Sequence, residues 1–355
     1  MKNIDKLVKQ LVINKCNYAL ITDTDKINYY TNYNFHVGER FIGLIISDKG
    51  NKTLILNKLF DIYDIKDIEV IYYIDYENPF NIINNIIDGK VSIDNNIRGE
   101  HLFKYLDTNK ELDYINGNII DYVKAIKEKD ELEKMRIASK INDEVMHKVY
   151  DKLDIGISEK ELAKYIIDTF NSYPNTTISF EPIVAFGSNC ADPHAEPSDR
   201  KLKANESIII DMGCKTNGYC SDMTRTFFIN SCPIEDIYNT VRYANERAIE
   251  KVCNNVLHSD IDNEARTIIK DAGYEQYFTH RLGHGIGTNV HEPFDVSGSS
   301  DILIKSNMCF SIEPGIYIKD NYGVRIEDLV IATDNGYEVL NKFDKKLIIK
   351  KVEER

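Results

Sequence analysis

The sequence lacks any uninterrupted apolar run of the ~18–20 residues that a membrane-spanning helix needs. Positive charge is also scarce, because 44 Lys and Arg against 57 Asp and Glu leave a formal net charge of −13. A surface of that sign repels nucleic acid and anionic membrane faces, so we expect neither as a partner. Lysines interrupt the apolar residues of the N-terminus, which is not typical of a signal peptide. We therefore expect a cytoplasmic protein.

Tryptophan is absent, and the seven cysteines form no Cys-x-x-Cys pair. Zinc sites and the disulfide frameworks of small secreted domains use cysteines at short, regular spacings. The scatter in a large chain therefore favours free thiols in a reducing compartment. A cysteine metal site or a catalytic thiol is the alternative.

The length of 355 residues exceeds the ~100–200 residues of a typical domain and predicts about two. Hydrophobic residues make up 43% and charged residues 28%, which excludes a disordered or fibrous chain. Strand patterns at 42–46 and 53–56 flank a turn at 48–51, and helical segments follow near 80–87 and 101–106. We predict a mixed α/β domain over residues 1–122 and a second domain over 123–355.

Helix patterns dominate the start of the second domain. Apolar residues at three- and four-residue steps predict a long amphipathic helix: Leu132, Met135, Ala138, Ile141 and Val145. Ser158 with Glu161 has the form of a capping box and predicts a second helix. Two more are expected after Pro233 and Ser259, the last ending at Gly273.

The segment 207–228 predicts a hairpin that carries two aspartates. Apolar stretches flank Lys215-Thr216-Asn217-Gly218, a strong turn signal. Counting outward from the turn places Asp211 about opposite Asp222. Two close carboxylates in a half-buried hairpin repel each other and need cations. Hydrogen-bonded aspartates at a sheet edge are the alternative for this segment alone.

A second hairpin is predicted over residues 310–331. Glu313 and Glu327 are equidistant from Asp320, the middle of the turn, and so face each other. Together the two hairpins supply four carboxylates, whose charge two divalent cations would neutralise. Carboxylates with one imidazole suit manganese, iron(II), cobalt or zinc. Two such metals generate a hydroxide near neutral pH and stabilise an oxyanion.

Half of the eight histidines lie in polar, glycine-containing segments: His194, His280, His284 and His291. Glycines at 283, 285 and 287 argue against one continuous helix through His280 and His284, and they let the backbone approach a site closely. A glycine-rich loop with incidental histidines is the alternative. We expect His36, His101, His147 and His258 to be surface or structural residues.

The segments NCADPHA, DMGCKTNGYCSDMTRTF, HRLGHGIGTNVHE, SIEPGIY and GVRIED, in this order, resemble the proline-peptidase branch of the pita-bread metallopeptidases. That branch includes aminopeptidase P and prolidase, also called Xaa-Pro dipeptidase. The resemblance covers residues 125–355, and the preceding residues are similar to a creatinase-type N-terminal domain in size and pattern. It implies an α/β (α+β) fold, in which a smaller N-terminal α/β domain precedes a pita-bread domain. The latter has an antiparallel sheet flanked by helices in two pseudo-symmetric halves.

The resemblance also implies roles for ten residues. The metal ligands would be Asp211, Asp222, His284, Glu313 and Glu327, with Asp222 and Glu327 bridging both ions. His194 and His291 would contact the substrate and stabilise the intermediate. His280 and Arg325 would line the proline end of the site, with Tyr317 beside the metals.

The function that the resemblance implies is hydrolysis of the Xaa-Pro bond at the N-terminus of peptides. The nucleophile would be a hydroxide bridging two divalent ions, manganese first, with cobalt, zinc or iron(II) as alternatives. Glu313 would act as general acid–base, and His291 would stabilise the oxyanion. The expected partners are small peptides with proline at position two and a second copy of the chain in a homodimer.

Two departures favour aminopeptidase P over prolidase. Asp295 stands where some prolidases carry an arginine that engages the dipeptide carboxylate, and the absence of tryptophan removes any tryptophan wall against longer substrates. Prolidase stays the first alternative. A metal-free creatinase-like hydrolase or binding module is disfavoured by the intact ligand set. Methionine aminopeptidase is disfavoured by the extra N-terminal domain and by the SIEPGIY and GVRIED segments.

Overall fold

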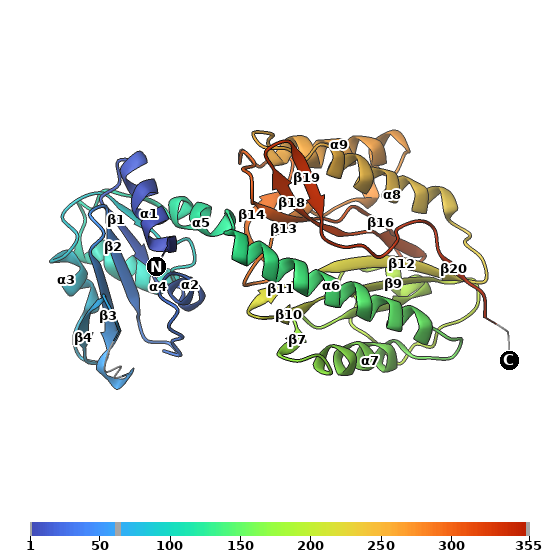
Figure 1. The fold of residues 1–355 in the computed structure, drawn as a ribbon, viewed down its shortest axis with the longest axis horizontal. Helices are drawn as coiled ribbons and strands as arrows, with labels where there is room; N and C mark the ends of the chain where they lie inside the picture. Colours follow the sequence, from blue (N-terminus) through green and yellow to red (C-terminus); the bar gives the residue numbers. More distant parts are fainter. Residues whose placement is uncertain (1, 61–64, 353–355) are drawn as a thin grey trace. The chain divides into compact units, whose positions relative to one another are not determined.

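Two structural units follow each other along the chain in the computed structural model, which describes residues 2–60 and 65–352. They comprise Met1–Lys124 and Ala125–Arg355 (Figure 1). The domain limits of 1–122 and 123–355 stay a prediction. Within the described residues, no helix is both long and apolar enough to cross a membrane.

The first unit is built on one mixed sheet in the order β4-β3-β2-β1-β5-β6. Its strands are β1 (Tyr18–Ile21), β2 (Gly43–Ser47), β3 (Lys52–Asn57), β4 (Glu69–Tyr73), β5 (Val91–Ile93) and β6 (Tyr114–Asn116). Its helices are α1 (Lys2–Ile13), α2 (Thr24–Thr31), α3 (Pro79–Asn84), α4 (Gly99–Thr108) and α5 (Asn118–Ala125). The hairpin predicted from 42–46 and 53–56 is β2–β3, an antiparallel pair. The sequence analysis missed β1 and α2, which are too short to show a clear period.

The helices of the second unit begin and end close to the predicted positions. They are α6 (Lys129–Lys152), α7 (Glu159–Asn171), α8 (Glu235–Glu250) and α9 (His258–Asp271). The capping box is present, since the Ser158 side chain accepts from Glu161 N while the Glu161 side chain accepts from Ser158 N. Gly273 follows α9 with a φ of 84°, a left-handed conformation that glycine adopts without strain.

Four sheets make up the rest of the second unit. Two larger sheets have the orders β20-β12-β9-β8 and β14-β13-β15-β18-β19, and two smaller ones have the orders β11-β10-β7 and β16-β17. The strand pairs are antiparallel except β12 with β20, which is parallel. The strands are β7 (Thr176–Ile178), β8 (Ile183–Phe186), β9 (Ser207–Met212), β10 (Cys214–Thr216), β11 (Tyr219–Cys220), β12 (Met223–Ile229), β13 (Gly283–Gly285), β14 (Glu292–Val296), β15 (Cys309–Ile312), β16 (Gly315–Ile318), β17 (Tyr322–Arg325), β18 (Asp328–Thr333), β19 (Gly336–Val339) and β20 (Ile349–Lys350).

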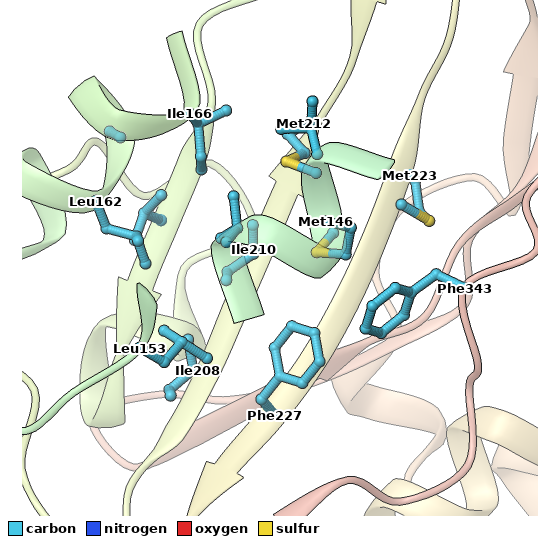
Figure 2. Close-up of a cluster of buried hydrophobic side chains, with 14 of the residues drawn as sticks. Met146, Leu153, Leu162, Ile166, Ile208, Ile210, Met212, Met223, Phe227 and Phe343 are labelled. Atoms are coloured by element: carbon cyan, nitrogen blue, oxygen red, sulfur yellow. The ribbon is translucent and has the colours of Figure 1, made fainter. Parts of the chain in front are cut away.

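Helices cover both sides of these sheets (Figure 1). Met146 of α6 and Leu162 of α7 pack with Ile210 and Phe227 of β9 and β12 in one buried cluster (Figure 2). Successive side chains of a strand point to opposite faces. Phe228 accordingly lies on the other side, with its ring centroid 5.9 Å from that of Tyr238 in α8. Strand β12 is therefore buried between two helical layers, as the expected pita-bread fold requires.

Candidate metal centre

The first predicted hairpin forms, with its register shifted from the prediction. Asn217 and Gly218 connect β10 to β11 with φ values of 51° and 82°. These positive angles are those of the tight turns that favour Asn-Gly. In the β9–β12 ladder the residue opposite Asp211 is Thr224, so the prediction that Asp222 stands there was two residues out. Asp222 directly precedes β12 and is buried, as is Asp211.

The second predicted pair, Glu313 and Glu327, has the expected register. Strands β16 and β17 pair Gly315 with Arg325, and β15 and β18 pair Ile312 with Asp328. If the register of either ladder is continued past its last pair, Glu327 lies opposite Glu313. Each glutamate lies where the chain passes between the five-stranded sheet and the two-stranded sheet. The side chains therefore emerge at the junction of two sheets.

Glycines on either side of His284 allow the close packing of β13. A Cβ atom on Gly283 would lie 1.9 Å from the Ser311 carbonyl oxygen, and one on Gly285 would lie 2.4 Å from that of Pro293. Only glycine fits at these two points. The segment is a strand rather than a helix, which confirms the interpretation of the glycine spacing.

The loop that carries His194 is held by a buried carboxylate. Glu159 accepts hydrogen bonds from Phe186 N at 2.7 Å, Asn189 Nδ2 at 2.9 Å and Ser198 N at 2.9 Å. These bonds fix both ends of the loop. The first residue of α7 thus places a polar loop beside the sheet.

These segments surround one pocket with a volume of about 520 Å³. It is lined by Phe180, Ile183, Pro193, His194, Asp211, Asp222, His280, Arg281, His284, Val290, His291, Glu313, Arg325 and Glu327. Nine of the ten residues predicted for the site are in this set, and Tyr317 is not. The sequence analysis named neither the apolar lining residues nor Arg281. The apolar lining residues and Arg281 lie in the segments that carry the histidines, and this closeness in sequence could have indicated them.

Three side chains form a compact donor cluster. One donor atom each of Asp222, His284 and Glu327 lies within 4.8 Å of the others. Glu313 Oε1 is 3.4 Å from His284 Nε2. The other ring nitrogen, His284 Nδ1, is 3.1 Å from the Gly285 carbonyl oxygen. Such a contact orients the ring of a metal-binding histidine and leaves Nε2 free for a metal.

Buried oxygens without partners also fit a cation. Among the described residues, Asp211 Oδ1 and Asp222 Oδ1 are buried and accept no hydrogen bond. A buried carboxylate oxygen in that state costs free energy unless a cation neutralises it. Carboxylate oxygens with one imidazole are a donor set for manganese, iron(II), cobalt or zinc. The donor atoms of this pocket are therefore suited to binding divalent metal ions.

The pKa values of these groups have the same physical cause. Burial raises the pKa of Asp222 well above its usual range, and the neighbouring Glu327 carboxylate adds to the effect. Burial likewise raises the pKa of Glu313 to about 7. It lowers the pKa of His284 to about 3, with His291 contributing. The cluster therefore combines a neutral imidazole with carboxyls that resist ionisation until a cation is close.

Arg325 is bound to other site residues rather than free in the pocket. Its guanidinium donates to Asp211 Oδ2 at 2.8 Å, Tyr317 Oη at 2.9 Å and Thr224 Oγ1 at 3.1 Å. Thr224 Oγ1 in turn donates to Glu327 Oε2 at 2.8 Å. His280 Nε2 lies 3.2 Å from the same Tyr317 oxygen. Arg325 and Tyr317 thus connect the carboxylates to the predicted proline end.

The cysteines do not contribute donors to this cluster in the part of the chain that the structure describes. All seven are free thiols. Cys190 donates to the Ala185 carbonyl at 3.1 Å, and burial raises its pKa to about 12. A thiol in that state is neither a nucleophile nor a ready metal ligand.

The pita-bread fold and its carboxylate–imidazole pocket define the class of protein as a metallopeptidase. The chain belongs to metallopeptidase family M24, whose family model matches residues 133–334. The model of the creatinase/prolidase N-terminal domain matches residues 3–112. Metallopeptidases of this family use divalent metals.

Relatives are similar over nearly the whole chain. An uncharacterised peptidase of Staphylococcus haemolyticus is 37% identical over 362 residues, covering 97% of this chain and 100% of the relative. A prolidase from Thermococcus sibiricus is 33% identical with a TM-score of 0.86 and covers 98% of each chain. The dipeptidase PepE from Mycobacterium ulcerans is 27% identical with a TM-score of 0.93, over 99% of this chain and 98% of that one. The enzyme class predicted from the sequence is thereby confirmed.

Proposed function

We propose that the chain is a two-metal exopeptidase that hydrolyses the bond before a proline at position two of a peptide. The observation that carries this proposal is the buried cluster of Asp222, His284 and Glu327, with Glu313 beside it, in one pocket. The similarity to a solved prolidase supports the choice of proline. Removal of one residue from the N-terminus, the aminopeptidase activity, is the first candidate.

Five residues would hold the metals: Asp211, Asp222, His284, Glu313 and Glu327. All five line the pocket, and two of them carry the unpartnered oxygens. When bound, two divalent ions would supply a hydroxide near neutral pH and stabilise the developing oxyanion. Manganese is the first candidate, and cobalt, zinc and iron(II) are the alternatives.

Glu313 and the histidines would handle protons and charge. Glu313 lies beside the cluster, with Oε1 3.4 Å from His284 Nε2, and a carboxylate so placed can act as a general acid–base. Glu313 would accept the proton of the attacking water and pass it to the leaving nitrogen. The His291 ring centroid is 4.3 Å from that of His284. From there His291 would donate a hydrogen bond to the oxyanion, with His194 as a further substrate contact.

The apolar part of the lining suits a proline ring. Phe180, Ile183 and Val290 lie in the same pocket as His280. Burial lowers the pKa of His280 to about 4, so its ring is neutral near pH 7. A proline nitrogen inside a peptide has no N–H to donate, so shape and apolar contact must recognise it.

A dipeptidase is the second candidate, favoured by one observation. Asp295, whose charge argued against a dipeptide carboxylate, forms an ion pair with Arg281, with Nη1 and Oδ1 3.1 Å apart. The negative charge is therefore compensated at short range. The argument for longer peptides loses its electrostatic basis.

The test is a substrate panel of Ala-Pro, Ala-Pro-Ala and Met-Ala, run with manganese, cobalt and zinc. We expect hydrolysis of the proline peptides, two ions bound per chain, and loss of activity on chelation. Preference for Met-Ala would indicate methionine aminopeptidase activity. Full activity of a protein without bound metal would overturn the proposal.

A further inference from the structure

A buried ion pair is attached to the loop that carries His291. Glu292, the residue after His291, accepts a hydrogen bond from Lys127 Nζ at 2.8 Å, across 165 positions of sequence. The side chains of Lys127 and Glu292 are only 2% and 1% exposed. A buried ion pair stabilises a fold no better than apolar side chains of similar volume, so stability alone does not account for it. The proposed chemistry uses neither residue.

The Glu292 carboxylate also closes the loop that precedes it. Glu292 Oε1 accepts hydrogen bonds from Thr288 N at 2.9 Å, Thr288 Oγ1 at 3.1 Å and Asn289 N at 3.3 Å. The other oxygen, Oε2, would lie 2.7 Å from a Cβ atom on Gly287, so the start of the loop packs directly against the carboxylate. One buried side chain therefore fixes the loop on both sides of His291.

Lys127 is itself anchored beside the strand that leads to the metal centre. Its backbone N donates to the Asn307 carbonyl oxygen at 3.0 Å. The preceding residue, Ile126, forms an antiparallel bridge with Met308. Met308 is followed by β15, which ends one residue before Glu313. The ion pair thus ties the His291 loop to the segment that carries a proposed metal ligand.

His291 lines the pocket, and its ring centroid lies 4.3 Å from that of His284. Successive side chains of an extended chain point to opposite faces, which lets Glu292 be buried away from the pocket while His291 enters it. We propose that Glu292 and Lys127 are positioning residues, which hold the His291 ring where it donates to the oxyanion. This inference rests on the proposed function and adds two residues to it.

The first test is a double-mutant cycle of Glu292→Gln and His291→Ala, measured with metal bound and Ala-Pro as substrate. Glu292→Gln keeps the size of the side chain and one acceptor oxygen but loses the charge that attracts Lys127. We expect kcat to fall ~10–100-fold, because a small misplacement of a catalytic group has that effect. In the His291→Ala background the further fall should be no more than about twofold. Bound metal and KM should match wild type, and equal losses in both backgrounds would overturn the inference.

Variants of the cation control for stability. Lys127→Met leaves the Glu292 carboxylate buried without this cation, which is strongly destabilising. The double variant Lys127→Met/Glu292→Gln removes both charges and should show the same loss of kcat as Glu292→Gln. The matched control is Lys26→Met, since Lys26 forms a buried ion pair with Asp94 at 2.6 Å in the first unit. It should lower Tm at unchanged kcat. A loss of kcat as large as that of Glu292→Gln would assign the effect to stability and overturn the inference.

Histidine NMR separates this inference from the proposed function. With isotope-labelled histidine, the His291 ring signal is identified by its absence in His291→Ala. Glu292→Gln should shift or broaden this signal and leave that of the exposed His36 unchanged. An unmoved His291 signal would overturn the inference at any level of activity. A wild type that binds metal but cleaves neither Ala-Pro nor Ala-Pro-Ala would overturn the proposed function, while the spectrum would still decide whether the pair holds His291.

Discussion

Arg325 Nη2 lies 2.8 Å from Asp211 Oδ2, and these side chains are only 3% and 12% exposed. Removing one partner of a buried ion pair leaves the other charge uncompensated, which costs far more than the pair contributes. Asp211 also presents a second oxygen that accepts no hydrogen bond within the described chain. Arg325 therefore holds Asp211 through one oxygen, which under the proposed function leaves the other for a cation.

Replacing Arg325 should act on metal binding. We expect Arg325→Gln to weaken metal affinity and lower kcat by ~10–100-fold, the range for groups that orient metal ligands. Arg325→Lys keeps the charge but not the planar fork, so its metal affinity and kcat should lie between those of the wild type and of Arg325→Gln. The test is a metal titration of each variant together with measurement of its kcat and KM. A change confined to KM would show that Arg325 acts at the proline end instead.

Loss of a carboxylate from the cluster should be more severe. Asp222→Asn or Glu327→Gln removes a predicted bridging charge. We expect kcat to fall by more than the ~10–100-fold that follows loss of a residue that only orients a metal ligand. Without metal, each variant should be at least as thermostable as wild type, because repulsion between buried carboxylates is relieved. Bound metal and Tm should be measured. The exposed Asp301→Asn variant is the control, and wild-type turnover in Asp222→Asn would contradict the ligand assignment.

Metal should stabilise the protein more strongly at higher pH. In the metal-free protein the pKa of Glu313 is raised to about 7 from an ordinary ~4.3, so its contribution to stability is lost as pH rises through 7. Because His284 has a pKa of about 3, it has no proton to release between pH 5 and 8. The gain in Tm on adding manganese should therefore increase from pH 5 to 8. A gain that is constant or decreases would exclude proton release by the carboxyls.

His291 should affect kcat more than KM. If it donates a hydrogen bond to the oxyanion, His291→Ala should lower kcat by ~10²–10³-fold. Steady-state kinetics on Ala-Pro provide the test. His36→Ala, an exposed position in the first unit, should behave as wild type. A rise in KM at unchanged kcat would assign His291 to substrate binding.

Local signals predicted much of the framework correctly. The Ser158–Glu161 capping box and the Asn217-Gly218 turn depend on neighbours in sequence, and both form as expected. The Glu313–Glu327 register also follows from one turn. The Asp211–Asp222 register was two residues out, because the turn is centred between Asn217 and Gly218 rather than between Thr216 and Asn217. A small error in the turn moves every partner along the strand.

By itself the sequence determined the residue types of the site, the helix and strand periods, and the order of segments that marks the family. These properties are local or additive along the chain. Only the tertiary structure decided which charges meet. Arg325 pairs with Asp211 across 114 positions, and Arg281 pairs with Asp295 because β14 returns beside β13. Coulombic and hydrogen-bond energies depend on distances of a few ångströms, which sequence spacing does not specify until the strands are paired.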